Sequence, residues 1–117
     1  MNDMICFYKV ANLDLVKKFY EDILNLKLYK DQERCLIYET KQHHKIGFCE
    51  CTSQHVICDS IIAFVYETKD EVDEMYHIMK HHMFTPIHYG LNEFYQIYHF
   101  FITDFNGLKV EFQTFIN

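Results

Sequence analysis

The sequence reads DLVKKFY at residues 14–20 and DEVDEMY at residues 70–76, so one pattern of acidic, apolar and aromatic residues occurs twice, 56 positions apart. A second correspondence follows, because KIGF at residues 45–48 matches KVEF at residues 109–112 with an offset of 64. Self-similarity at a fixed spacing indicates a repeated structural unit. The second copy is longer by about eight residues, which we place in residues 85–97, where a longer loop or strand is expected.

Both copies of the pattern have the periodicity of an amphipathic helix. Apolar residues at i, i+3, i+4, i+7 and i+8 predict a helix over residues 13–25 and another over residues 69–83. Asn12 or Asp14 can cap the first helix. Thr68 and Glu71 have the spacing of a capping box and predict the start of the second helix.

Each predicted helix lies between segments of strand length. ICFYKV and IIAFVY precede the helices, and three segments rich in β-branched and aromatic residues follow each one. Each half therefore reads β-α-β-β-β. We expect one α+β domain over residues 1–117, with module one at about 1–55 and module two at about 56–117.

Composition excludes several classes of partner. The chain has 117 residues and a net charge of −6 with no run of basic residues, so nucleic acid is not an expected partner. No apolar run reaches the ~18 residues of a membrane helix, and no signal peptide is evident. We therefore expect a cytoplasmic protein with no membrane partner, whose five cysteines are reduced thiols.

Two further motifs carry a resemblance to a known superfamily. VANLD at residues 10–14, running into Phe19 and Tyr20, resembles the opening of the first module in the glyoxalase/bleomycin-resistance/dioxygenase (vicinal oxygen chelate) superfamily. FFITDFNGLKVEF at residues 100–112 resembles its closing hairpin, with Phe105 where proline is usual. Asn106 and Gly107 still supply a turn. The resemblance implies two βαβββ modules that form an open half-barrel sheet around a cleft, with the helices on the outer face.

Strand alternation then assigns side chains to that cleft. In the closing hairpin we pair residue 103 with 108 and residue 100 with 111. The cleft residues predicted in this way are Phe7, Lys9, Arg34, Leu36, Tyr38, Cys49, Ala63, Tyr98, Phe100, Ile102, Glu111 and Gln113.

The metal positions of the superfamily are mostly without donor atoms. The resemblance places them at Ile5, Gly47, Ile61 and Glu111, of which only Glu111 can coordinate an ion, whereas metal sites need several converging donors. We therefore predict no metal and no cofactor. Glu111 is the candidate catalytic residue, as a general base or a ligand-gripping carboxylate, although a structural role is also open.

Three functions are consistent with these residues. The first is a metal-independent protein that binds a small organic molecule, for sequestration or resistance. The second is a metal-dependent lyase, isomerase or dioxygenase-like enzyme of the same superfamily, so that enzymatic activity is undecided. The third is a non-catalytic interaction module. A homodimer is expected with any of them.

Overall fold

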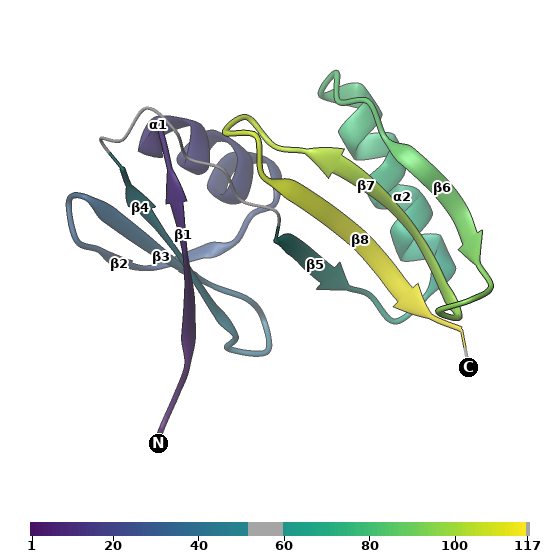
Figure 1. Cartoon of the computed structure of the whole chain (residues 1–117), viewed down its shortest axis with the longest axis horizontal. Helices are drawn as coiled ribbons and strands as arrows, with labels where there is room; N and C mark the ends of the chain where they lie inside the picture. The colour runs from purple at the N-terminus through teal and green to yellow at the C-terminus, as the bar shows by residue number, and fades with distance from the viewer. Residues whose placement is uncertain (52–59, 117) are drawn as a thin grey trace. The chain divides into compact units, whose positions relative to one another are not determined.

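The computed structural model describes residues 1–51 and 60–116, which form two compact units, Met1–Cys58 and Asp59–Asn117. The first unit contains β1 (Ile5–Val10), α1 (Leu13–Val16), the π-helical η1 (Lys17–Ile23), β2 (Lys27–Asp31), β3 (Cys35–Glu39) and β4 (Lys45–Glu50). The second contains β5 (Ile61–Val65), α2 (Lys69–His81), β6 (Ile87–Asn92), β7 (Ile97–Thr103) and β8 (Lys109–Phe115) (Figure 1). The predicted repeat of β-α-β-β-β is confirmed.

Both units have the same sheet topology. The strand orders are β1-β4-β3-β2 and β5-β8-β7-β6. The pairs β1–β4 and β5–β8 are parallel, and all other neighbours are antiparallel. The first and last strands of each module therefore lie side by side, so residues far apart in the sequence share one face of the sheet.

The helix starts follow the predicted caps. The Asn12 carboxamide oxygen accepts hydrogen bonds from the backbone N–H groups of Asp14 and Leu15 at 2.8 and 3.3 Å. The Thr68 hydroxyl accepts from the N–H of Glu71 at 3.2 Å, as a capping box requires. The first helix differs from the predicted α-helix after Val16, because it continues as η1 and ends with an i→i+5 bond from Leu24 N–H to the Phe19 carbonyl.

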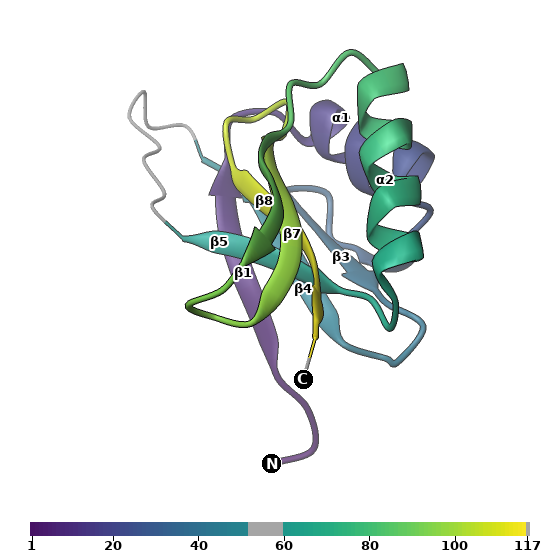
Figure 2. The same ribbon diagram turned by 90° about the vertical axis from the view of Figure 1, so that its right-hand side faces the viewer.

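Each helix covers one face of the sheet in its own unit. In the first unit Tyr20 of η1 packs on Phe48 of β4 with ring centroids 4.4 Å apart. In the second, Tyr76 of α2 meets Phe100 of β7 edge-on at 5.7 Å, and Figure 2 shows α2 lying along that face. Phe100 stacks in turn on Phe112 at 4.9 Å. The opposite side of each sheet is called its helix-free face below.

The hairpins that close the two modules have identical loops of three residues. In the first, the N–H of Thr40 donates to the carbonyl of His44, and in the second the N–H of Asp104 donates to the carbonyl of Leu108. The third loop residue has positive φ in both, 67° for His43 and 88° for Gly107. This geometry belongs to three-residue hairpin loops. Residue 103 consequently pairs with 109 and residue 100 with 112, one position away from the predicted register.

This shift corrects the predicted orientation of β3 and β7. A slip of one residue moves every side chain of a strand to the other face. Leu36 pairs with Phe48 and Phe100 with Phe112, so both point toward the helix of their unit. The prediction of a cleft orientation is therefore wrong for Leu36, Tyr38, Tyr98, Phe100 and Ile102, and Arg34, which precedes β3, has the same parity. Instead, Ile37 pairs with Gly47, and His99 with Gln113.

Candidate functional site

The parallel strand pairs place the other predicted cleft residues as expected. Phe7 pairs with Gly47 and Lys9 with Cys49 on the helix-free face of the first sheet. On the second sheet Ala63 pairs with Glu111, one step from Gln113 on the same face. That these residues contact a ligand remains a prediction.

Glu111 is the centre of a buried polar cluster on the second sheet. Its Oε2 lies 2.6 Å from Nδ1 of His99, and its Oε1 accepts a 2.7 Å hydrogen bond from the Gln113 carboxamide. Both His99 and Glu111 are about 95% buried, with 5% and 6% of their surfaces exposed. Because a carboxylate accepts and does not donate, Nδ1 carries the proton in this contact. The carboxylate thus fixes both the tautomer and the direction of the imidazole ring.

His99 is the residue that sequence reasoning missed. The predicted register placed Tyr98 and Phe100 on the helix-free face and therefore pointed His99 toward the helix. The closing bond between Asp104 and Leu108 was the missing information. A turn of three residues ending in glycine at Gly107 is the sequence signal that would have placed His99 beside Gln113.

Small residues flank the His99–Glu111 pair. Gly90 of β6 pairs with His99, and Ala63 of β5 pairs with Glu111. A Cβ built on Gly90 would meet no atom within 4 Å, so the space directly over this glycine is open. Phe101 lies next to the pair on the same face, 5.1 Å from the His99 ring and under the ammonium of Lys109. The pair therefore has one aromatic neighbour, Phe101, and two strand partners with little or no side chain, Ala63 and Gly90.

The equivalent position on the first sheet is covered by an aromatic ring. A Cβ added at Gly47 would lie 2.4 Å from Cδ1 and 2.5 Å from Cε1 of Phe7, so the phenyl ring rests directly on the glycine. The Phe7 side chain is half exposed, at 51%. No side chain of any length fits at residue 47 unless the ring of Phe7 moves.

A disulfide lies beside this glycine. Cys35 and Cys49 are direct cross-strand partners with Cα atoms 4.1 Å apart, and their sulfur atoms are bonded. The expectation of reduced thiols is therefore wrong for these two cysteines, because it was drawn from the missing signal peptide and not from the register that brings them together. Cys6 and Cys51 are free thiols, and Cys58 lies outside the described residues.

The sequence resemblance predicts metal ligands at four positions, and the side chains there offer few donor atoms for a divalent ion. Ile5, Gly47 and Ile61 supply no donor atom, and the carboxylate of Glu111 is held by its two neighbours. A lysine is the strand partner of each isoleucine, Lys45 beside Ile5 and Lys109 beside Ile61, and an ammonium group disfavours a nearby cation. Over residues 1–51 and 60–116, no group of three His, Cys, Asp or Glu side chains could hold a metal ion.

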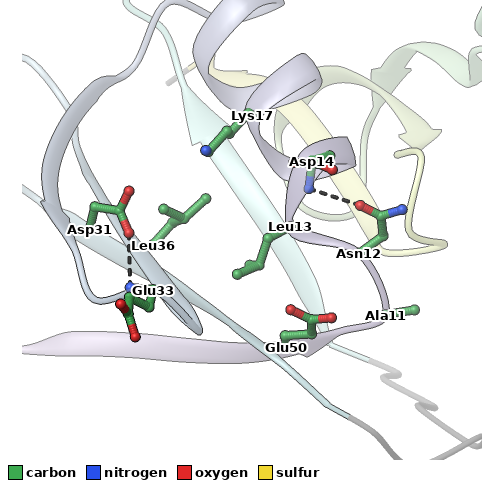
Figure 3. Close-up of a pocket in the computed structure, with 9 residues that line it drawn as sticks. All are labelled: Ala11, Asn12, Leu13, Asp14, Lys17, Asp31, Glu33, Leu36 and Glu50. Carbon is green, nitrogen blue, oxygen red and sulfur yellow. Dashed lines mark hydrogen bonds between the residues drawn. The ribbon is translucent and has the colours of Figure 1, made fainter.

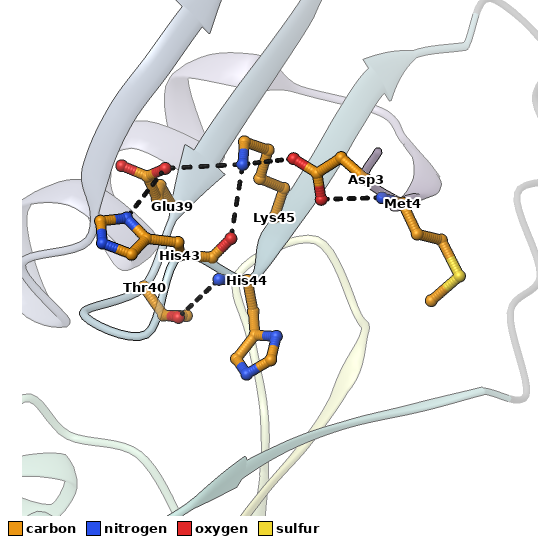
Figure 4. A network of polar contacts seen from close by, with 7 residues as sticks. All are labelled: Asp3, Met4, Glu39, Thr40, His43, His44 and Lys45. Atoms are coloured by element: carbon orange, nitrogen blue, oxygen red, sulfur yellow. Dashed lines mark hydrogen bonds and ion pairs between the residues drawn. The ribbon is translucent and has the colours of Figure 1, made fainter. Parts of the chain in front are cut away.

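Lys45 belongs to a polar network at the start of β4. Its ammonium lies 2.5 Å from an Asp3 carboxylate oxygen and 3.5 Å from one of Glu39, and Figure 4 shows it between the two acids. His43 approaches the same Glu39 oxygen at 3.4 Å. The hydrogen bond from Lys45 lowers the pKa of Asp3 and, in the reverse direction, Asp3 raises the pKa of Lys45. The network fastens residues just before β1 to the strand that carries Gly47.

A second polar cluster joins α2 to its sheet on the helix-covered side. The Asp73 carboxylate accepts hydrogen bonds from the hydroxyl groups of Tyr89 and Tyr98. These two bonds lower the pKa of Asp73. Tyr98 is thus a structural partner of the helix, which agrees with its corrected orientation.

A pocket of about 520 Å³ lies within the first unit, beside the start of α1. Its polar lining contains four carboxylates and Lys17, and Leu36 is the predicted cleft residue that reaches it (Figure 3). The Asp31 carboxylate accepts a hydrogen bond from the N–H of Glu33 at 2.9 Å. Its lining residues are Ala11, Asn12, Leu13, Asp14, Lys17, Asp31, Glu33, Leu36 and Glu50.

Paired βαβββ modules, each with one helix on one face of a mixed four-stranded sheet, define the structural class of this protein. Neither a protein-family model nor a curated protein sequence matches the chain. Solved structures do. An integron cassette protein from the mobile metagenome of the Halifax Harbour sewage outfall is 19% identical, with a TM-score of 0.81 and 97% of each chain covered.

Two solved structures with functional names have the same fold. Lactoylglutathione lyase from Agrobacterium tumefaciens is 18% identical with a TM-score of 0.79, covering 95% of this chain and 91% of its own. The fosfomycin resistance protein FosX from Listeria monocytogenes, solved with Mn(II) and sulfate, is 17% identical with a TM-score of 0.78, covering 99% and 92%. The chain therefore has the glyoxalase/bleomycin resistance/dioxygenase fold, as the sequence motifs predicted.

In the part of the chain that the structure describes, no helix is long and apolar enough to cross a membrane.

Proposed function

We propose that this protein binds a small organic molecule without a metal ion, on the helix-free face of the second sheet, and so sequesters or carries it. The observation that carries the proposal is the chemistry of four positions. Ile5, Gly47 and Ile61 offer no donor atom at positions where the sequence resemblance predicts metal ligands, and the Phe7 ring lies on Gly47. Glu111 is the one position of the four that carries a donor group, and a single carboxylate is insufficient for a divalent ion.

The surface around Glu111 supports a binding role. A site for a small molecule combines apolar side chains with a few fixed polar groups that orient the ligand. Glu111, His99 and Gln113 are such fixed groups, since each is hydrogen-bonded to its neighbour. Ile61 and Val65 are 44% and 59% exposed on the same face of β5 and provide apolar surface beside them.

The test measures metal and ligand separately. Purified protein is analysed for bound metals, and a compound library is then screened by thermal shift with and without EDTA. We expect no stoichiometric metal, and ligands that raise the melting temperature equally in both conditions, because binding to the native state stabilises it. A stoichiometric metal, or stabilisation that EDTA abolishes, would contradict the proposal.

Replacing one of two exposed alanines with arginine locates the binding surface. Ala63→Arg places a long charged side chain beside Glu111 and should abolish the ligand-induced shift. Ala11→Arg is the matched control, because Ala11 is also exposed but lines the acidic pocket of the first unit. Loss of binding in Ala11→Arg with retention in Ala63→Arg would move the site to that pocket and refute the proposed surface.

A further inference from the structure

We infer that His99 forms a subsite for a ligand hydroxyl or N–H group, so that the molecule bound is an aromatic or apolar compound that carries a hydrogen-bond donor. The inference rests on the proposed function for the presence of a ligand on this face. It goes further because it names the accepting atom, Nε2 of His99, and the chemical class of its partner.

The contact with Glu111 decides which nitrogen of the His99 imidazole carries the proton. Nδ1 of His99 faces a carboxylate oxygen of Glu111 at 2.6 Å and donates to it. In the neutral ring the other nitrogen, Nε2, then carries a lone pair and accepts. Gln113 holds the second oxygen of the same carboxylate at 2.7 Å, so the acid cannot turn away from the ring. The three side chains therefore present one acceptor in one fixed direction.

The other ring nitrogen of His99, Nε2, is available for a hydrogen bond with a ligand. Among the residues that the structure describes, Nε2 of His99 has no hydrogen-bond partner, and the ring's polar contact is the one to Glu111. No fully enclosed side-chain nitrogen or oxygen in the same residues lacks a partner. Nε2 is therefore reachable from the surface, although 95% of the residue is covered. A buried imidazole with one open nitrogen is arranged to accept a hydrogen bond from an incoming molecule.

The neighbours of His99 determine which kind of ligand can approach it. Gly90 is the strand partner of His99 and leaves space that a side chain would fill. Phe101, two residues farther along β7, lies with its ring centroid 5.1 Å from that of His99. A flat ring can pack against Phe101 while its donor reaches Nε2, since aromatic pairs favour offset or edge-on contact. A neutral donor is favoured over a cation, because the ammonium of Lys109 lies over the same phenyl ring at 4.4 Å.

The test compares probes that differ in one group. The full chain is titrated with 2-naphthol, 2-methoxynaphthalene and 2-naphthoate, and binding is followed by protein NMR, including the imidazole ¹⁵N signals. We expect His99 to be the tautomer protonated on Nδ1, and 2-naphthol to bind about fivefold more tightly than its methyl ether, as one net hydrogen bond implies. The Nε2 signal should shift with 2-naphthol and stay constant with the ether.

A conservative variant separates the ligand contact from the structural one. In His99→Asn the carboxamide N–H can replace Nδ1 and keep the bond to Glu111, but nothing replaces Nε2. We expect a folded protein that binds both naphthalenes with equal affinity. His81→Asn on α2 is the control, since His81 is exposed near the end of that helix, and it should keep the fivefold preference.

Each outcome decides the inference. Equal binding of alcohol and ether by the wild type, tightest binding of 2-naphthoate, or a preference that survives in His99→Asn would overturn it and leave the proposed function standing. Failure of all three probes also overturns it, and the compound library then reports separately on whether the protein binds any small molecule.

Discussion

Replacing Gly47 with alanine tests the packing that closes the metal position of the first module. A Cβ at residue 47 would lie 2.4 Å from the Phe7 ring, so the ring must leave its place. The backbone of Gly47 is ordinary strand, and alanine is otherwise favoured over glycine there by about 0.5–1 kcal/mol. The sign of the effect therefore depends on Phe7 alone.

The size of the effect follows from the exposure of Phe7. The ring is 51% exposed, so about half of a phenylalanine surface, roughly 100 Å², is covered in the native state. At about 25 cal/mol per Å², turning the ring into solvent costs up to about 2.5 kcal/mol. Gly47→Ala should lower the free energy of unfolding by about 1–2 kcal/mol after the backbone gain is included.

A double-mutant cycle isolates this contact. In a Phe7→Ala background the same Gly47→Ala change should stabilise by about 0.5 kcal/mol, because the clash is gone. Urea unfolding of the four proteins measures the coupling, with equal m-values as the check that the denatured state is unchanged. If Gly47→Ala stabilises the protein with Phe7 still present, the ring does not lie on the glycine and the argument for a closed position is wrong.

Three further perturbations have defined outcomes. Reduction of the Cys35–Cys49 bond, which closes a loop with a sequence separation of 14, should lower the free energy of unfolding by about 3 kcal/mol and expose two more thiols to a thiol reagent; unchanged urea midpoints would argue against the bond. Tyr38→Phe removes a 3.1 Å bond to Glu21 from a buried side chain and should cost about 0.5–1.5 kcal/mol in urea unfolding, whereas no loss would mean that the bond is absent. Asp73 has a lowered pKa in the folded state, so its contribution to the free energy of unfolding is present above the unfolded-state pKa of about 4 and is lost as the pH falls through the folded-state pKa. Asp73→Asn should therefore weaken the pH dependence of the free energy of unfolding measured between pH 5 and 2, and an unchanged pH dependence would contradict this.

Much of the fold was predictable because periodicity and capping are local properties. Asn12 and Thr68 mark helix starts through bonds to residues two or three positions away, and the structure contains both caps. The π-helical continuation after Val16 was not predictable, since the same apolar stripe suits either helix type. The doubled module itself was readable from the repeat.

The site was predicted only in part, for a reason that lies in two turns. Strands β1, β4, β5 and β8 had the right orientation, so Phe7 and Glu111 were placed on the correct face. The loops after Thr40 and Asp104 each contain one residue more than two-residue hairpins do, and this exchanged His99 for Tyr98 and Phe100. In the first hairpin the loop residue with positive φ is His43 and not a glycine, so the sequence did not indicate the length of that loop. Cytoplasmic location, a homodimer and the ligand itself remain predictions.

The equal loops at Thr40 and Asp104 keep the closing hairpins in step, 64 residues apart. Cys35 then corresponds to His99, Gly47 to Glu111 and Cys49 to Gln113. These three equivalent positions hold a disulfide and a glycine covered by Phe7 in the first unit, and a hydrogen-bonded row of side chains in the second. Equivalent backbone positions thus carry a covalent link in one module and hydrogen-bonded, ionisable groups in the other.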